Sequence, residues 1–400
     1  MGKPQVVLGV SGGIAAYKAC EVLRRLTESG HDVRVVPTAA ALNFVGAATW
    51  SALSGHPVAT GVWQDVHEVP HVRIGQHADL VVVAPATADL LAQAAHGLAG
   101  DLLTNTLLTA RCPVVFAPAM HTEMWEHPAT QENVATLRRR GAVVIEPAVG
   151  RLTGADSGKG RLPEPAEIAE TCRAVLARGT AGLAADLTGR HVVVSAGGTR
   201  EPLDPVRFLG NRSSGKQGYA LARAAVARGA RVTVVAANTA LADPAGADVV
   251  TVGTALQMRE AVLKAAADAD AVVMAAAVAD FRPAVHAASK IKKRDGEEAP
   301  ALELVRNPDI LAEVSAGRRP GQIVVGFAAE TDDVLANGRA KLTRKGCDLL
   351  VVNEVGEERT FGAEENEAVV LAADGTETAV PHGPKAALAD VVWDLVARRW

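Results

Sequence analysis

Short, uninterrupted apolar runs alternate with helical segments along the whole chain. In the first half these runs are QVVLGV (5–10), DVRVVP (32–37), DLVVVAP (79–85), PVVFAP (113–118) and AVVIEP (142–147). They are rich in β-branched residues and do not alternate between apolar and polar positions, which is typical of strands buried on both faces. The pattern predicts a parallel sheet with helices on both sides.

The same series begins again in the second half of the chain. Its strand-like runs are HVVVSAG (191–197), RVTVVAA (231–237), AVVMAAA (271–277), QIVVGFA (322–328) and DLLVVNE (348–354). Between the two series, residues 177–189 combine a helix end with small residues and glycine. We place a boundary near residue 188 and expect two doubly wound, Rossmann-like α/β domains, 1–188 and 189–400.

Composition narrows the class of protein. The chain is 48% hydrophobic and 22% charged, as globular proteins are, and its net charge of −4 argues against nucleic acid as a partner. The four cysteines are widely spaced, which favours reduced thiols over a disulfide framework. No apolar run has the length that a membrane span needs, and no secretory leader is visible at the N-terminus. We expect a soluble, cytoplasmic protein without a membrane partner.

Two glycine-rich segments could bind anions. GVSGGIAAYK (9–18) follows the first expected strand and opens the first helix, where backbone N–H groups favour a phosphate. It lacks G-x-G-x-x-G spacing, so a mononucleotide is favoured over NAD, although a simple tight turn remains the alternative. GNRSSGKQG (210–218) resembles a P-loop, but Gln217 stands where a P-loop needs Ser or Thr.

Three further segments of the first half place polar residues at expected strand ends. They are VPHVRIGQHADL (69–80), APATADL (84–90) and APAMHTEMW (117–125). A lone histidine such as His71, expected just before a short helix, is more often structural or exposed than catalytic.

Together these segments resemble the flavin-dependent cysteine decarboxylases, in which a His…Ala-Asp run, a Pro-Ala-[Ser/Thr]-Ala run and a Pro-Ala-Met-Asn run occur in the same order. The resemblance implies bound FMN and decarboxylation of 4′-phospho-N-pantothenoylcysteine, with His71 as the base for the oxidative step. Oxidation of the thiol side by flavin would create the electron sink that loss of CO₂ requires.

The resemblance also assigns binding residues in the first half. The FMN-binding positions are Gly9, Ser11, Gly12, Thr38, Ala86, Thr87 and Met120, and the substrate-flap positions are Asp156, Gly158, Gly160 and Arg161. His121 replaces the family's Asn, which binds the substrate carboxylate, and an imidazole can still donate a hydrogen bond. Gly154 replaces the flap cysteine that serves as proton donor, so the donor in this chain is unidentified.

The second half contains a long polar loop and several short motifs. They are SAGGTREPLDPVRFLGNRSSGKQG (195–218), AAAVADF (275–281), KIKKRDGEE (290–298), NPDILAEV (307–314) and GFAAET (326–331). Long ordered loops in α/β domains are usually functional. The basic run could be an ordinary solvated turn. In NPDILAEV, the proline suits a first helical turn, whose amides could bind an anion.

These motifs resemble the phosphopantothenate–cysteine ligases, and fusion to a decarboxylase half is typical of the bifunctional bacterial enzymes of coenzyme A biosynthesis. The implied reaction joins 4′-phosphopantothenate to cysteine through an acyl-cytidylate made from CTP. Lys290 would neutralise phosphate charge, and Asn211 would hold the carboxylate with Arg207 nearby. The CTP-binding positions are Lys290 with Met274, Ala275, Ala276, Asp280, Pro308, Asp309, Ile310, Leu311, Phe327, Lys341 and Lys345.

The same resemblance implies Mg²⁺ on the CTP phosphates, with unknown protein ligands. It also implies a homo-oligomer, expected to be a dodecamer, in which decarboxylase halves form trimers with flavin at subunit interfaces and ligase halves form dimers. Two alternatives stay open: a ligase whose first half only binds flavin or regulates, and a non-enzymatic flavoprotein that binds a partner. The ligase motifs disfavour the second alternative, because an interaction protein has no use for them.

Overall fold

The computed structural model describes residues 2–58, 69–152, 156–179, 185–292, 301–330, 333–354 and 365–400. The chain separates into two compact units, which we call unit 1 (Met1–Asp186 with Pro244–Gly246) and unit 2 (Leu187–Asp243 with Ala247–Trp400). The main chain thus passes from unit 1 to unit 2 after Asp186, close to the boundary placed from the sequence.

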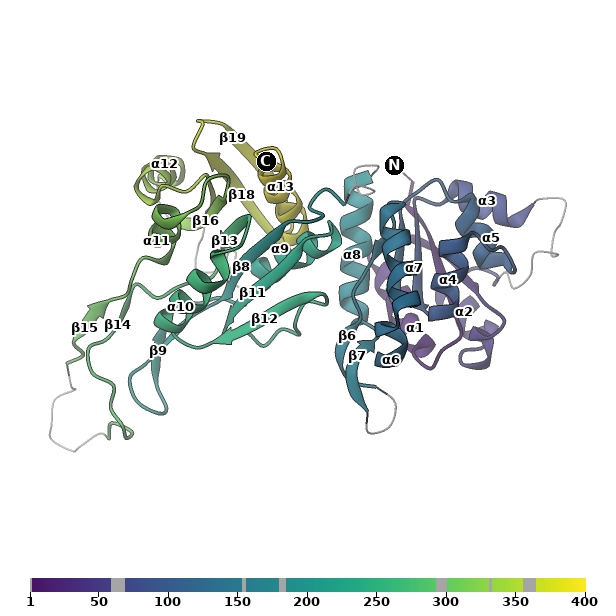
Figure 1. Cartoon of the computed structure of the whole chain (residues 1–400), viewed down its shortest axis with the longest axis horizontal. Coiled ribbons are helices and arrows are strands. Elements are labelled where there is room, and N and C mark those ends of the chain that lie inside the picture. The colour runs from purple at the N-terminus through teal and green to yellow at the C-terminus, as the bar shows by residue number, and fades with distance from the viewer. Residues whose placement is uncertain are drawn as a thin grey trace. The chain divides into compact units, whose positions relative to one another are not determined.

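Unit 1 alternates strands and helices along the chain (Figure 1). Its elements are β1 (Gln5–Val10), α1 (Ala16–Glu28), β2 (Asp32–Pro37), the 3₁₀ turn η1 (Ala41–Asn43), α2 (Ala47–Ser54), α3 (Pro70–His77), β3 (Leu80–Ala86), α4 (Ala88–His96), α5 (Leu102–Thr109), β4 (Val114–Pro118), α6 (Thr122–Glu126), α7 (Pro128–Arg139), β5 (Val143–Val144), β6 (Ala148–Arg151), β7 (Ser157–Arg161) and α8 (Pro165–Arg178).

The sheet of unit 1 is parallel, with the strand order β2-β1-β3-β4-β5. Helices α3, α4, α5 and α7 contribute to the core on one face, and α1 packs with α8. Because β1 and β3 are neighbours although β2 separates them in the sequence, the winding reverses between them. Ligands of such folds bind at the carboxyl ends of the strands beside this reversal.

Unit 2 begins with another parallel series and ends with antiparallel strands. Its elements are β8 (His191–Gly197), β9 (Arg200–Pro202), β10 (Phe208–Gly210), α9 (Lys216–Ala227), β11 (Arg231–Ala237), β12 (Ala247–Val252), α10 (Ala255–Ala266), β13 (Ala271–Met274), β14 (Phe281–Pro283), β15 (Leu304–Arg306), α11 (Ile310–Gly317), β16 (Ile323–Glu330), α12 (Val334–Lys345), β17 (Leu349–Glu354), β18 (Glu365–Ala372), β19 (Glu377–Pro384) and α13 (Lys385–Ala397).

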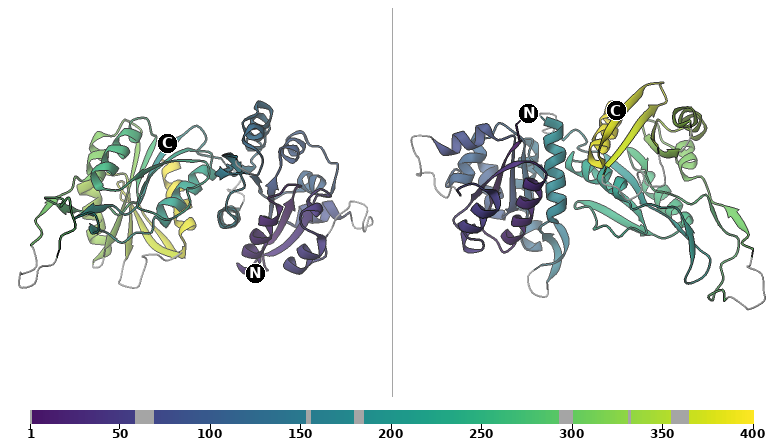
Figure 2. Two further views of the ribbon diagram at one scale, coloured as in Figure 1. Left: turned by 90° about the horizontal axis from the view of Figure 1, so that it is seen from below. Right: turned by 180° about the vertical axis from the view of Figure 1, so that it is seen from behind.

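The sheet of unit 2 has the order β12-β11-β8-β13-β16-β17-β18-β19, and its winding reverses between β8 and β13. Helices α9 and α13 cover one face, while α10, α11 and α12 cover the other. The pair β14–β15 forms an arm that extends away from this sheet in every view (Figure 2). The doubly wound α/β class predicted from the sequence is therefore confirmed in both units.

Two details of the sequence prediction are wrong. His71 lies inside α3 rather than before it, because the helix already begins at Pro70. Helix α11 begins at Ile310, so Pro308 precedes the first turn, and the Asp309 side chain caps the helix by accepting from the Ala312 N–H at 3.1 Å. The structure also adds two strands that the sequence analysis did not name, since β18 and β19 join the sheet of unit 2 in antiparallel orientation.

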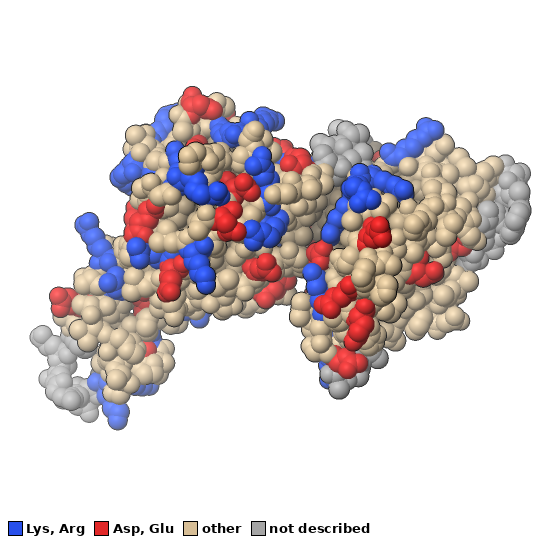
Figure 3. Space-filling model, in the orientation of Figure 1, with Lys and Arg blue, Asp and Glu red and all other residues tan. Residues whose placement is uncertain are grey.

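Charged residues of both signs are interspersed on the face shown in Figure 3. Within the described parts of the chain, no helix combines the length and the apolar character needed to cross a membrane.

Candidate active sites

A cavity of about 870 Å³ lies beyond the carboxyl ends of β1, β3 and β4 in unit 1. It is lined by Gly12, Gly13, Ile14, Ala15, Tyr17, Lys18, Pro85, Thr87, Ala88, Ala119, Met120, His121, Met124, Arg151, Leu152, Gly160, Arg161 and Leu162. Five of these were predicted on the sequence as binding positions for flavin or for the flap: Gly12, Thr87, Met120, Gly160 and Arg161. The structure brings them together with His121, as the winding reversal leads one to expect.

Ser11 connects the loops that follow β1 and β3. Its buried hydroxyl donates to the Pro85 carbonyl at 2.7 Å and accepts from the Thr87 N–H at 3.0 Å. Thr87 in turn caps α4 by accepting from the Leu90 N–H. A small hydroxyl residue is needed here, because only such a side chain both donates to one loop and accepts from the other.

The hairpin β6–β7, expected as a substrate flap, packs against the loop after β4. The Met120 N–H donates to the Gly160 carbonyl at 2.9 Å, and a Cβ on Gly160 would lie 2.3 Å from the Met120 carbonyl oxygen. Gly158 is equally restricted, since a Cβ there would lie 2.2 Å from the Thr122 hydroxyl oxygen. Close packing therefore restricts both positions, and Gly160 lies on the cavity wall.

Ion pairs support this hairpin. Lys159 of β7 lies 2.7 Å from Glu146, which also pairs with Arg138 of α7 at 2.6 Å. Burial by itself would raise the pKa of Glu146, but Arg138 and Lys159 outweigh it and lower that pKa below its usual value. Arg161 pairs with Glu164, which lies 3.9 Å from Lys18.

The cavity residues fit a flavin mononucleotide. The volume of the cavity lies in the range of small-molecule sites, about 300–1,000 Å³. Lys18, Arg151 and Arg161 on its wall suit phosphate groups. Gly12 lines the cavity, and only glycine fits there because a Cβ would lie 2.3 Å from the Ala40 Cβ.

His71 is not among the residues that line this cavity. It lies in the first turn of α3, where its carbonyl accepts from the Thr109 hydroxyl at 2.8 Å. Its Nδ1 is buried and has no hydrogen-bond partner among the described residues. A single chain therefore does not bring the expected base beside the expected flavin site.

Four other predicted residues of unit 1 are not among those that line the cavity. Gly9 is inside β1, where a Cβ would lie 2.5 Å from Leu103 Cδ1, and Thr38 follows β2 and binds the Val10 carbonyl. Ala86 accepts from the Ala119 N–H, and the Asp156 carbonyl closes the hairpin by accepting from the Leu152 N–H. Gly154 lies outside the described residues.

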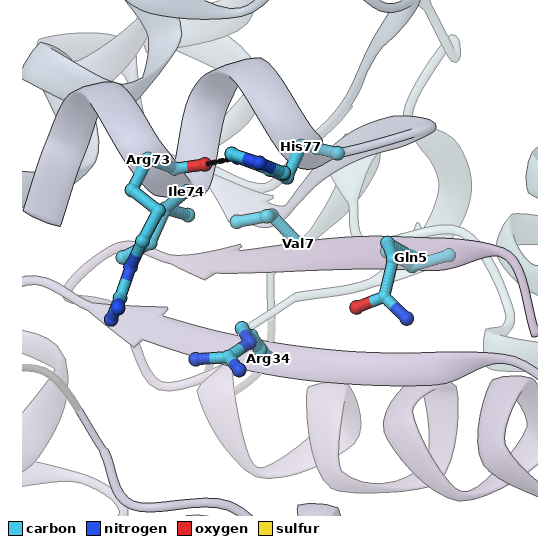
Figure 4. Close-up of a pocket in the computed structure, with 8 residues that line it drawn as sticks. Gln5, Val7, Arg34, Arg73, Ile74 and His77 are labelled. Carbon is cyan, nitrogen blue, oxygen red and sulfur yellow. Dashed lines mark hydrogen bonds between the residues drawn. The ribbon is translucent and has the colours of Figure 1, made fainter.

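A second cavity, of about 310 Å³, lies at the opposite ends of the strands (Figure 4). Gln5 and Val7 of β1, Arg34 of β2, and Ile74 and His77 of α3 line it. His77 is hydrogen-bonded to the Arg73 carbonyl at 2.8 Å. Because Gln5 and Val7 belong to the first half of β1, this cavity is not part of the strand-end site.

In unit 2, the loop after β8 and the segment after β13 are joined by hydrogen bonds. Gly198 and Ala277 form an isolated parallel bridge, and the Thr199 N–H donates to the Ala277 carbonyl at 3.2 Å. Asn211 donates from its side chain to the Val278 carbonyl at 3.0 Å. The predicted Asn211 thus lies at the winding reversal, where a substrate of this fold is expected.

Three residues that the sequence analysis did not single out hold this edge together. The Ser195 hydroxyl accepts from the Ala276 N–H at 3.1 Å, and the Thr199 hydroxyl accepts from the Ala279 N–H at 2.9 Å. Asn307 donates through its side chain to the Ala279 carbonyl at 2.8 Å. Their positions at or near expected strand ends were the only signal in the sequence.

Apart from Lys290, the CTP-binding positions predicted from the resemblance fall on four neighbouring segments of unit 2. Met274 ends β13 and is followed by Ala275 and Ala276, while the Asp280 carbonyl accepts from the Asn307 N–H at 2.8 Å. The others are Pro308, Asp309, Ile310 and Leu311 at the start of α11, Phe327 in β16, and Lys341 and Lys345 in α12. The structure therefore gathers the AAVADF and NPDIL motifs at one edge.

Lys345 and Asp309 form an ion pair in this structure. Burial opposes ionisation of Asp309, but the hydrogen bond from Lys345 dominates the remaining causes and the pKa of Asp309 is lowered. The two residues were predicted as separate CTP contacts, and here they bind each other.

Gln217 explains why the loop at 210–218 is not a P-loop. Its side chain donates to the Lys385 carbonyl at 3.1 Å and accepts from Asn366 at 3.3 Å. It therefore connects α9 to β18 and α13, which a metal-binding Ser or Thr would not do. Gly218 packs on β8, because a Cβ there would lie 2.6 Å from the Ala196 Cβ.

Lys290 is exposed, and the next residue, Ile291, is hydrogen-bonded to the DPVR sequence (204–207). The Ile291 N–H donates to Asp204 at 3.1 Å, and Arg207 donates to the Ile291 carbonyl at 2.7 Å. Arg207 also pairs with Asp204 at 2.6 Å, and this hydrogen bond lowers the pKa of Asp204. Residues 293–298 of the basic run lie outside the described residues. Across the described parts of the chain, no three His, Cys, Asp or Glu side chains gather as metal ligands.

Both halves match known families. Residues 1–177 match the family model described as Flavoprotein, and residues 187–399 match the DNA/pantothenate metabolism flavoprotein C-terminal domain. The coenzyme A biosynthesis bifunctional protein CoaBC of Mycolicibacterium smegmatis is 64% identical over 99% of this chain and 97% of that protein. Proteins of the same name from Mycobacterium tuberculosis and Bacillus subtilis are 64% and 44% identical, over 98% and 94% of this chain and 96% and 92% of those proteins. The chain belongs to the family of bifunctional coenzyme A biosynthesis proteins.

Proposed function

We propose that this chain catalyses two successive reactions of coenzyme A biosynthesis. The domain 189–400 joins cysteine to 4′-phosphopantothenate with CTP, and the domain 1–188 decarboxylates the resulting 4′-phospho-N-pantothenoylcysteine with FMN. The observation that carries this proposal is the presence, in one chain, of two strand-end sites in units that match the two family models.

In the decarboxylase half, bound FMN would supply the two-electron chemistry that makes loss of CO₂ possible. Gly12 and the Ser11–Thr87 contact would position it, and Lys18, Arg151 and Arg161 would neutralise phosphate charge in the cavity. His121 on the cavity wall would donate a hydrogen bond to the substrate carboxylate.

His71 would act as the base for the oxidative step. Since it does not line the cavity of its own chain, this role requires a second copy to bring it beside the flavin. The trimer implied by the sequence resemblance, with flavin at subunit interfaces, provides such an arrangement.

In the ligase half, Lys290 would neutralise the triphosphate while the carboxylate attacks the α-phosphate of CTP and pyrophosphate leaves. Asn211 would then hold the acyl-cytidylate until the cysteine amine displaces CMP. Mg²⁺, when bound, would supply further positive charge to the CTP phosphates. Asp280, Phe327 and the backbone at 308–311 would bind the nucleotide, together with Lys341.

We further propose a cytoplasmic homo-oligomer, up to a dodecamer. In unit 2, large apolar side chains are exposed on the arm and beside it, among them Phe281 (47%), Val285 (80%) and Val206 (61%). Exposed apolar side chains grouped in this way are typical of a protein–protein contact.

The test uses the purified full-length chain with 4′-phosphopantothenate, cysteine, CTP and Mg²⁺. We expect pyrophosphate release that depends on 4′-phosphopantothenate, followed by CO₂ release from 4′-phospho-N-pantothenoylcysteine. Absence of CO₂ at saturating substrate, with FMN bound, would reject the decarboxylase assignment and favour a ligase with a flavin-binding module.

A further inference from the structure

We propose that Asp204 is a positioning residue for the ligation reaction. It holds the segment that carries Lys290 in place. This inference rests on the proposed function of Lys290. The segment concerned is residues 284–292, which we call the Lys290 segment.

The Lys290 segment is anchored at both ends. Near its start, Ala284 donates from its N–H to the Glu303 carbonyl at 2.9 Å, and Ala287 donates to the Leu203 carbonyl at 3.0 Å. Near its end, Ile291 is held through both of its backbone polar groups, by Asp204 and by Arg207. Lys290 directly precedes Ile291, so these two contacts set where the Lys290 side chain begins.

The two oxygens of Asp204 have different partners. Oδ1 accepts from the N–H groups of Val206 and Arg207, both at 2.8 Å, and so forms the local turn. Oδ2 accepts from the Ile291 N–H at 3.1 Å and from the Arg207 Nε and Nη2 at 3.0 and 2.6 Å. One carboxylate oxygen therefore makes the turn, while the other holds the Lys290 segment.

The carboxylate of Asp204 is buried. Asp204 is 2% exposed, so its carboxylate depends on these donors rather than on water. Arg207 likewise donates hydrogen bonds from its Nε and Nη2 groups to Asp204 and to the Ile291 carbonyl. We therefore assign Arg207 together with Asp204 to positioning the segment.

Asp204→Asn separates the two roles. An amide keeps one oxygen for the turn and replaces Oδ2 by an NH₂ group, which cannot accept from Ile291 or Arg207. Asp348→Asn is the matched control, because Asp348 also accepts from a backbone N–H (Val324, 2.8 Å) and from an arginine (Arg318, 2.8 Å), but it does not contact the Lys290 segment.

The first measurement is amide hydrogen exchange in the full-length protein without substrates. We expect Asp204→Asn to accelerate exchange at Ile291 at least about tenfold, and Asp348→Asn to leave it unchanged. Unchanged exchange at Ile291 in Asp204→Asn would overturn the proposal, whatever the activity.

The second measurement is a double-mutant cycle on pyrophosphate release from CTP. In the wild type and in Asp348→Asn, Lys290→Gln should slow release by the same factor, whereas in Asp204→Asn that factor should fall at least about tenfold. Equal factors in all three backgrounds would show that Asp204 does not act through Lys290. If Lys290→Gln had no effect in the wild type, the Lys290 assignment itself would fail, and the exchange measurement would still decide whether Asp204 holds the segment.

Discussion

Units 1 and 2 share a doubly wound sheet but form their strand-end sites differently. In unit 1, glycines and a buried serine hold a wide cavity open, and the expected base lies outside it. In unit 2, the loop after β8 is hydrogen-bonded to the segment after β13, and Lys290 is positioned by contacts with residues 203–207. The same fold therefore forms one strand-end site as a cavity and the other as a set of hydrogen-bonded loops.

If His71 of another copy completes the site of unit 1, the largest expected effect is that of His71→Asn on decarboxylation. We expect CO₂ release to fall by about 10³-fold, which is typical for loss of a general base. Ligation should stay within about twofold of wild type. His77→Asn, on the same helix but on the second cavity, is the control and should change neither rate.

Mixed oligomers test the origin of His71 directly. Mixing His71→Asn with His121→Ala chains before reassembly should restore about a quarter of the wild-type sites, because each site would take the two residues from different copies of a symmetric oligomer. No recovery, with reassembly verified by mass, would mean that both residues act within one chain.

For the site of unit 2, we expect smaller effects of substitutions, which fall on two separate steps of ligation. Lys290→Gln should slow pyrophosphate release about 10²-fold, while Asn211→Asp should mainly block conversion of the acyl-cytidylate. Rapid-quench measurement of both steps, with Lys264→Gln as a control on α10, distinguishes the two roles. Unchanged rates in both variants would remove these residues from the site.

The serine contact of unit 1 predicts a moderate effect on flavin. Ser11→Ala leaves the Thr87 N–H without its partner, at a cost of about 1–3 kcal/mol, so we expect FMN to bind about tenfold more weakly. Ser29→Ala, at the other end of α1, should leave FMN affinity unchanged. Equal flavin titrations for the three proteins would contradict a role for the Ser11 hydroxyl.

The smallest expected effect concerns the pairs that support the hairpin β6–β7. The folded-state pKa of Glu146 is lowered, so its stabilisation is complete above the unfolded-state pKa, about 4.3, and is lost as the pH falls through the lowered value. Glu146→Gln should cost about 1–2 kcal/mol of unfolding free energy at pH 7. That difference should shrink towards pH 3. If the difference in unfolding free energy between wild type and Glu146→Gln were the same at both pH values, the ion pairs of Glu146 would not be its cause.

Most of the architecture follows from local pattern. The uninterrupted β-branched runs lie at β1, β2, β3, β4, β8, β11, β13, β16 and β17 in the structure, because such runs are stable only where both faces of a strand are covered. The motifs after these runs lie at strand ends, so the edges of the two sites were predictable. The antiparallel strands β18 and β19 were missed. The prediction relied on apolar runs that alternate with helices, whereas β18, although it contains the apolar run AVVLA (368–372), is followed directly by β19, whose apolar residues are few and interrupted.

Local sequence pattern is sufficient to predict the fold class, the repetition of the strand series and the strand ends that carry polar residues. Which side chains meet depends on tertiary packing. Asp204 and Ile291 are 87 residues apart, and Ser195 and Ala276 are 81 apart, so no local pattern connects them. A buried acceptor must be satisfied by whichever donor the packing brings near, and the crossing of distant loops sets that donor.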